Sequence, residues 1–241
     1  MIVLTDKQTA EALFTQKQYD QKKTRIRRGN LVTDPKLLKK LTSADRYDPS
    51  AKDGISQRWL PGAQAATYCA QGDEHDTAGS VNETAVNATA QMEKRMRKME
   101  ALKRVLPEPS LMTMENGKWK MVNGFSNLDL LIVSWGSNKG VILDVINTPT
   151  PGPSPVRGRG EAPTIGYLHY TYLWPMKTER LEKLMKKAKR TVLVECNAQG
   201  QLGMTIKMAS GIDLTEKILK YDGRPFFYDE LLQKLLSCLA V

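Results

Sequence analysis

The sequence predicts an α/β fold whose second half is a small doubly wound parallel sheet, preceded by an extended arm and a long helix. Three apolar or β-rich runs indicate the strands: Leu128 to Trp135, Ile165 to Leu173, and Thr191 to Glu195. A helical pattern separates the last two, with apolar residues spaced three and four apart between Thr178 and Arg190. Strands that alternate with helices in this way favour a parallel sheet.

Three further helices are expected in this half of the chain. One begins at Lys139 and follows the first strand, and a second runs from Gly200 to Met208. The apolar face of the last helix consists of Leu231, Leu232, Leu235, Leu236 and Leu239. These helices can cover both faces of the predicted sheet.

A long helix is predicted from Asn82 to Leu106. Asn82 is a plausible N-cap and Pro107 ends the element. One side carries Met92, Met96, Met99, Val105 and Leu106, and the basic residues lie mainly elsewhere. We interpret the methionines as core or interface packing rather than as a partner-binding groove.

The first 80 residues show little periodicity. Residues 2–4 form a short aliphatic run that predicts a strand, and a helix-like stretch follows at 8–14. A lone strand at the start suggests a chain that begins inside a domain. Residues 16–80 are rich in turn formers and are expected to form an extended arm that wraps a neighbour.

Residues 148–161 hold four prolines and three glycines, so they cannot form a helix or a central strand. A polyproline II ligand for an aromatic groove is one interpretation, and a flexible surface insertion is the one we favour. Together these patterns divide the chain into 1–16, 17–126 and 127–241, with the insertion at 148–163.

Composition narrows the class of protein. The longest apolar runs are too short to cross a bilayer, and the start does not resemble a signal peptide, so we expect a cytoplasmic protein without a membrane partner. Three isolated cysteines argue against a disulfide scaffold, an intrachain iron–sulfur cluster or a zinc site. The net charge of +10 fits the solvated faces of helices, and no nucleic-acid recognition pattern accompanies it.

Two kinds of candidate site stand out. Gly72 to Asp76 gathers three carboxylates and one histidine, but neighbouring side chains on a strand diverge, so a structural turn is favoured over metal binding or catalysis. The loops after two predicted strands contain Gly136, Ser137, Asn197 and Gly200, which are weak candidates for binding a cofactor at helix N-termini. Such loops also arise from ordinary α/β packing, which is the interpretation we favour.

We expect no catalytic residue and no metal ligand in this chain. The acids Glu195 and Asp222 are interpreted as hydrogen-bonded structural groups. The serines have no histidine at a motif spacing, so nucleophilic catalysis is not indicated.

Several fragments occur together in a recognisable order along nearly the whole chain. They are residues 2–6, 53–56, 61–62, 72–76 with Gly79, 93–98, 135–137 with Gly140, 173–175, 195–197 with 200–202, and 221–225. In this order and spacing they resemble the C-terminal portion of the α subunit of 2-oxoacid:ferredoxin oxidoreductases, particularly the 2-oxoglutarate synthase type.

The resemblance implies an organisation. Residues 1–16 would be the last strand and helix of a truncated pyrimidine-type domain, 17–126 a connecting arm with its helix, and 127–241 a domain like the C-terminal domain of transketolase. The N-terminal part of the α subunit would then be a separate partner. Two features depart from the family: Gln57 stands where proline is usual, and the Pro/Gly insertion interrupts a helix.

The implied activity is the thiamine-dependent oxidative decarboxylation of a 2-oxoacid to an acyl-CoA. The holoenzyme would use thiamine diphosphate, Mg²⁺, an iron–sulfur cluster and coenzyme A, with ferredoxin as electron acceptor. The family places the metal–diphosphate motif and the cluster in the β subunit, so the isolated chain is expected to bind no cofactor and to be inactive. The alternatives are a stand-alone, non-catalytic interaction module of the same fold, or a basic nucleic-acid-binding protein.

Overall fold

The computed structural model describes residues 2–13, 15–115, 118–147 and 163–239. The chain divides into two compact units, which we name by their content. The sheet domain comprises Met1–Phe14 with Pro107–Val241, and the arm domain comprises Thr15–Leu106. The predicted insertion at 148–161 lies outside the described residues.

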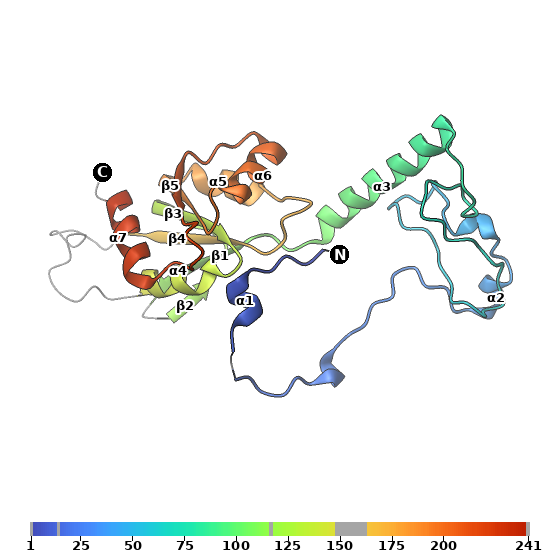
Figure 1. The fold of residues 1–241 in the computed structure, drawn as a ribbon, viewed down its shortest axis with the longest axis horizontal. Helices are drawn as coiled ribbons and strands as arrows, with labels where there is room; N and C mark the ends of the chain where they lie inside the picture. The colour runs from blue at the N-terminus through green and yellow to red at the C-terminus, as the bar shows by residue number, and fades with distance from the viewer. Residues whose placement is uncertain (1, 14, 116–117, 148–162, 240–241) are drawn as a thin grey trace. The chain divides into compact units, whose positions relative to one another are not determined.

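A mixed six-stranded sheet forms the centre of the sheet domain, with the strand order β2-β1-β4-β3-β5-β6 (Figure 1). Its strands are β1 (Ser110–Glu115), β2 (Lys118–Met121), β3 (Leu128–Trp135), β4 (Ile165–Tyr170), β5 (Ala188–Glu195) and β6 (Glu216–Leu219). Strands β4, β3, β5 and β6 are parallel, whereas β1 is antiparallel to both of its neighbours.

The central strand β3 is buried on both faces. Ile132 pairs with Tyr167 of β4 on one side and with Val192 of β5 on the other. Side chains of successive residues point to opposite faces, so Leu131 and Ile132 contribute to different core clusters. A strand covered on both faces needs a continuous apolar run, which is the pattern that this segment shows.

Helices cover both faces of this sheet. The helices α4 (Asn138–Asn147) and α7 (Tyr228–Leu239) supply Ile142, Val145, Leu231 and Leu235 to one cluster. On the opposite face, α5 (Glu179–Met185) and α6 (Gln201–Ser210) supply Leu181, Leu184, Leu202 and Ile206 to the other. The short helix α1 (Lys7–Glu11) also belongs to this domain, and none of its residues is buried.

The predicted α/β class and the alternation of strands and helices between residues 128 and 222 are confirmed. The prediction of a purely parallel sheet was incomplete, because β1 and β2 fall where only a connecting segment was expected. Strand β6 was not predicted. The helix expected to reach Arg190 ends at Met185, because Ala188 pairs with Leu128 and continues as β5.

The strand predicted at residues 2–4 does not form. Ile2, Val3 and Leu4 belong to no regular element and have exposed side chains, and no strand pairs with them among the described residues. Without a ladder partner the backbone groups are left to water, so β propensity alone does not make a strand.

The arm domain packs irregular chain against one face of helix α3 (Ala85–Val105). Its short elements are η1 (Gln21–Lys23), α2 (Pro35–Leu38) and η2 (Ser43–Asp45). The buried Trp59 donates its indole N–H to the carbonyl of Ala66 at 2.9 Å. Residues 15–30 are all exposed, whereas later parts of the predicted arm contact α3 of the same chain.

The structure of helix α3 differs from the prediction in two details. It begins after Thr84, and Asn82 lies outside, where its side chain accepts hydrogen bonds from the backbone N–H and the hydroxyl of Thr84. Met92 and Met96 are 53% and 59% exposed, so these two are not core residues of the chain, and their packing in an interface stays a prediction. Among the described helices, none is long and apolar enough to cross a membrane.

Candidate functional site

The candidate residues predicted from the sequence meet at one edge of the sheet. Gly136 and Ser137 follow β3, and Asn197 follows the neighbouring strand β5. The helices that leave these strands, α4 and α6, cover opposite faces of the sheet. This point between β3 and β5 is therefore a topological switch point, where open α/β sheets bind ligands.

The N-terminus of α4 is approached by an acid from the start of the chain. Ser137 donates a short hydrogen bond from its hydroxyl to Asp6, and Asp6 also accepts the backbone N–H of Thr9 at 2.8 Å. Burial works to raise the pKa of Asp6, but the hydrogen bonds from Ser137 and Thr9 outweigh it, so the pKa is lowered. The carboxylate of Asp6 therefore lies at the helix N-terminus where Ser137 was a candidate for binding a cofactor.

The loop after β5 is organised by Asn197. Its side-chain oxygen accepts the backbone N–H groups of Gln199, Gly200 and Gln201 at 3.1, 2.6 and 3.2 Å. Gly200 adopts φ +70°, a left-handed conformation that allows the chain to enter α6. The backbone donors of this loop therefore already have an acceptor within the protein.

Beneath this loop lies Glu195, which is fully buried. One carboxylate oxygen accepts the indole N–H of Trp135 at 3.1 Å and the amide of Asn197 at 2.6 Å. The carboxylate also accepts the backbone N–H groups of Leu202 and Gly203 in the first turn of α6, at 3.0 and 3.3 Å. Glu195 is therefore the hydrogen-bonded structural acid that the sequence predicted, and it satisfies the helix N-terminus internally.

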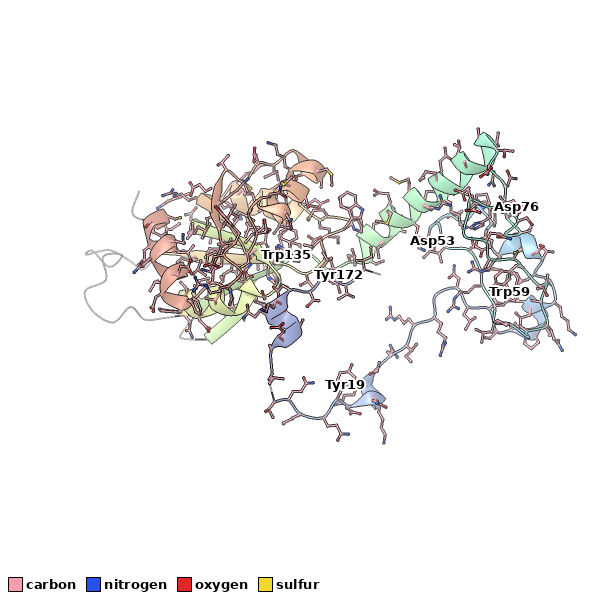
Figure 2. The ribbon with its side chains drawn as sticks, viewed as in Figure 1. Tyr19, Asp53, Trp59, Asp76, Trp135 and Tyr172 are labelled. Carbon is pink, nitrogen blue, oxygen red and sulfur yellow. The ribbon has the colours of Figure 1, made fainter. Side chains whose placement is uncertain are left out.

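Figure 2 labels Trp135, the last residue of β3, in the sheet domain. Beyond it, the thiol of Cys196 donates to the side-chain oxygen of Asn138 at 3.1 Å and so links the two loops of the switch point. Burial raises the pKa of this thiol. A thiol held in its protonated form is a poor nucleophile, so the geometry does not favour covalent catalysis here.

The second predicted structural acid, Asp222, belongs to an ion-pair cluster at the end of β6. Its carboxylate accepts from the buried ammonium of Lys220 at 3.0 Å, and Glu230 accepts from the same group at 2.8 Å. The hydrogen bond from Lys220 lowers the pKa of Asp222 to about 2. Asp222 is hydrogen-bonded, as predicted.

A buried pair on β4, Tyr167 and His169, was not predicted from the sequence. The hydroxyl of Tyr167 lies 2.7 Å from Nδ1 of His169, and both side chains are buried. Burial, with a smaller contribution from the charge of Lys139, lowers the pKa of His169 to about 4. The spacing of two residues on one strand places both side chains on the same face, which is a signal that could have identified the pair.

Because of His169, we expect the sheet domain to lose stability in acid. The pKa of His169 in the folded chain is below its ordinary value of 6.5, so the unfolded chain binds the proton more readily. We expect the free energy of unfolding to fall by roughly 2–3 kcal/mol between pH 6.5 and pH 4. Urea unfolding of His169→Gln, which cannot titrate, should show that much less dependence on pH. An unchanged pH dependence in this variant would contradict the assignment.

The acidic motif at residues 72–76 is a structural turn. Glu74 pairs with Arg95 of α3 at 2.7 Å, and His75 Nδ1 lies 2.9 Å from the carbonyl of Asp73. Asp76, labelled in Figure 2, accepts the backbone N–H groups of Ala78 and Ser80 at 2.9 and 3.0 Å. These side chains serve different partners. The described part of the chain contains no group of three histidine, cysteine, aspartate or glutamate residues that could hold a metal ion.

Comparison with known proteins gives no matching family model. The chain is 32% identical over 190 residues to the α subunit of 2-oxoacid:ferredoxin oxidoreductase 1 from Sulfurisphaera tokodaii, which covers 78% of this chain and 26% of that subunit. It is 30% identical over 237 residues to the 2-oxoacid:ferredoxin oxidoreductase α subunit from Saccharolobus solfataricus, which covers 96% of this chain and 33% of that subunit.

A solved structure shares the fold. It is the 2-oxoglutarate:ferredoxin oxidoreductase from Magnetococcus marinus with 2-oxoglutarate, coenzyme A and succinyl-CoA bound, with a TM-score of 0.64 and 23% identity over 80% of this chain and 30% of that one. The chain spans about a quarter to a third of the length of the curated relatives it matches. Over most of its length the chain is homologous to a segment of the α subunits of 2-oxoacid:ferredoxin oxidoreductases.

Proposed function

We propose that this chain is the α-subunit portion of a 2-oxoacid:ferredoxin oxidoreductase and acts only in complex with further subunits. The homology to α subunits over 78–96% of the chain carries the proposal. The reaction would convert a 2-oxoacid, coenzyme A and two oxidised ferredoxins into an acyl-CoA, CO₂, two reduced ferredoxins and a proton. We propose 2-oxoglutarate as the 2-oxoacid, since the structural neighbour is a 2-oxoglutarate enzyme.

The described residues do not offer a site for thiamine diphosphate and Mg²⁺. The donors at the start of α6 serve Asn197 and Glu195, and Ser137 at the start of α4 serves Asp6. No three-ligand group of acids, histidines or cysteines is found in the described ranges. We therefore assign no step through thiamine diphosphate, Mg²⁺ or an iron–sulfur cluster to residues of this chain, and propose that the β subunit holds them.

The partners proposed are the β subunit, a polypeptide equivalent to the remainder of the α subunit, and ferredoxin as acceptor. The relatives are three to four times as long as the matched segment, which supports a role for additional polypeptide. We propose that the complex works in the cytoplasm. In this arrangement the chain contributes a folded scaffold, and we propose that the loop with Gly136 and Ser137 lies at a subunit interface.

Co-expression with the β subunit and the remaining α-subunit polypeptide of the same organism tests this proposal. We expect a three-component complex to co-purify and to reduce ferredoxin or methyl viologen when 2-oxoglutarate and coenzyme A are both present. The chain alone, and the complex without it, should show no turnover. Activity of the isolated chain with thiamine diphosphate would contradict the proposed division of labour. Failure of all components to associate would favour a stand-alone interaction module instead.

A further inference from the structure

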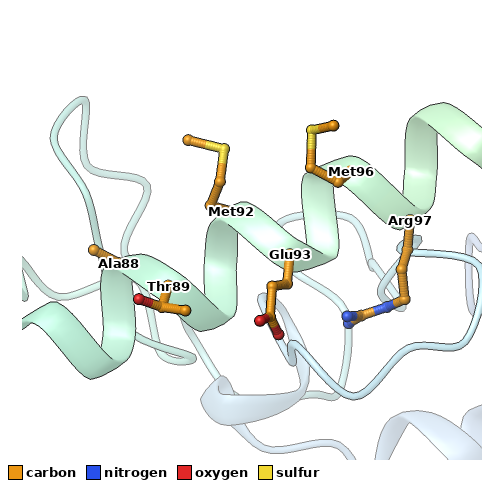
Figure 3. Close-up of a pocket in the computed structure, with 6 residues that line it drawn as sticks. All are labelled: Ala88, Thr89, Met92, Glu93, Met96 and Arg97. Atoms are coloured by element: carbon orange, nitrogen blue, oxygen red, sulfur yellow. The ribbon is translucent and has the colours of Figure 1, made fainter.

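Helix α3 buries polar side chains and exposes apolar ones, which is the reverse of the arrangement in an ordinary surface helix. The residues that it buries are Gln91 and Lys94, whereas Met92 and Met96 are more than half exposed. Figure 3 shows Met92 and Met96 projecting from the same side of the helix. Exposed apolar side chains gathered on one face mark an interaction surface more often than scattered ones do.

The polar face of α3 is used by the arm domain. Gln91 donates its side-chain amide to the carbonyl of Tyr47 at 3.1 Å, and the ammonium of Lys94 lies 6.0 Å from the centre of the Tyr47 ring. Arg97 donates to the carbonyl of Pro49. Because the arm contacts this polar face, it leaves the methionine face uncovered in the arm domain.

The exposed face has the spacing of a coiled-coil seam. Residues on this side alternate at steps of four and three along the helix: Ala85, Thr89, Met92 and Met96, which are exposed, and Met99 and Lys103, which are half-buried. A shallow groove of about 570 Å³ follows the first part of this seam, lined by Ala88, Thr89, Met92, Glu93, Met96 and Arg97. We call the six alternating residues the methionine seam. Three heptads of this kind can pair with a second helix.

The charges that flank the methionine seam favour a second copy of the same helix in parallel orientation. Arg95 lies directly before the seam residue Met96, and Glu100 lies directly after the seam residue Met99. In a parallel pair of helices, Arg95 of each helix therefore lies beside Glu100 of the other. An antiparallel pair would instead place Glu93 and Glu100 against the same acids of the partner, and Arg95 against Arg95. Opposite charges in one orientation and like charges in the other select the parallel pair.

We propose that two copies of this chain associate through the methionine seam of α3 as a parallel, in-register pair of helices. The arm lies on the opposite face of α3, so its contacts with Gln91 and Arg97 are compatible with pairing. Arg95 is 49% exposed while it pairs with Glu74, which leaves part of its guanidinium free to reach a second carboxylate. The inference is independent of the proposed enzymatic activity.

Sedimentation of the full chain over a concentration series tests the proposal. The wild type should form a reversible dimer of twice 27.0 kDa. The seam variant Met92→Glu/Met96→Glu should weaken dimerisation at least about a hundredfold, because four methionines leave the interface and four like charges enter it. The control Val105→Glu adds one charge at an exposed position off the seam and should dimerise as the wild type does. A wild type that stays monomeric at every concentration would overturn the proposal.

Two further variants test the orientation. Glu100→Lys should weaken the dimer, and Arg95→Glu/Glu100→Lys should restore it by exchanging the two charges. Circular dichroism checks that each variant keeps its helical content. In a background without Cys69, Cys196 and Cys238, Met96→Cys should oxidise to a covalent dimer, because a seam residue faces itself in a parallel pair. Val105→Cys should not, and equal cross-linking of both variants would refute the parallel seam.

Discussion

Replacing Glu195 with alanine is expected to lower the free energy of unfolding of the sheet domain by about 3–5 kcal/mol. The carboxylate is fully buried and accepts from Trp135, Asn197, Leu202 and Gly203. Alanine would leave these donors without an acceptor and open a cavity between β5 and α6. Urea unfolding monitored by circular dichroism measures the loss.

Two control variants separate the carboxylate from its surroundings. Glu195→Gln keeps the size and one acceptor oxygen, so the expected loss is smaller, about 1–2 kcal/mol. Asp229→Ala removes an exposed carboxylate from the first turn of α7 and should cost less than about 1 kcal/mol. If Glu195→Ala lowered the free energy of unfolding no more than Asp229→Ala does, the hydrogen bonds from the N-terminus of α6 to Glu195 would not be what holds this helix in place.

The sequence identified the strands of the sheet where burial alone determines the pattern. The predicted bounds of β3 match the structure because both of its faces are covered and the apolar run is continuous. The sequence pattern did not predict the secondary structure correctly where pairing with a distant strand determines it. Ala188 continues a helical periodicity in the sequence, but its pairing with Leu128 makes it the first residue of β5. Strand β1 likewise depends on a distant partner, since Leu111 pairs with Leu168.

The candidate site, like the sheet, could be predicted from the sequence only in part. Ser137 and Asn197 were identifiable because strand ends of a parallel sheet meet at one edge. The hydrogen bond from Ser137 to Asp6 joins residues 131 positions apart, and no local pattern encodes such a contact. The sequence also located the methionines on one side of α3. It did not reveal that the arm would contact the opposite side, because carbonyl acceptors such as that of Tyr47 select donors like Gln91.

Replacing Gly79 with alanine is expected to destabilise the arm domain by at least about 3 kcal/mol, because two separate effects add. Gly79 adopts φ +90°, which is unfavourable for a residue with a side chain. A Cβ at this position would also lie 1.9 Å from the carbonyl oxygen of Cys69, so the backbone on both sides of this contact must separate. Amide hydrogen exchange of peptides covering residues 45–80 should become faster.

Gly29→Ala provides the matched control, since the two glycines share a positive φ and differ in the space around them. Gly29 has φ +63° with no atom within 4 Å of an added Cβ, so alanine there carries only the backbone cost of about 1–2 kcal/mol. Exchange in the sheet domain serves as an internal reference for both variants. Equal effects of Gly79→Ala and Gly29→Ala would mean that conformational strain alone explains Gly79. A larger effect at Gly79 would show that its close approach to Cys69 fixes the turn that carries Asp76 and positions the arm against α3.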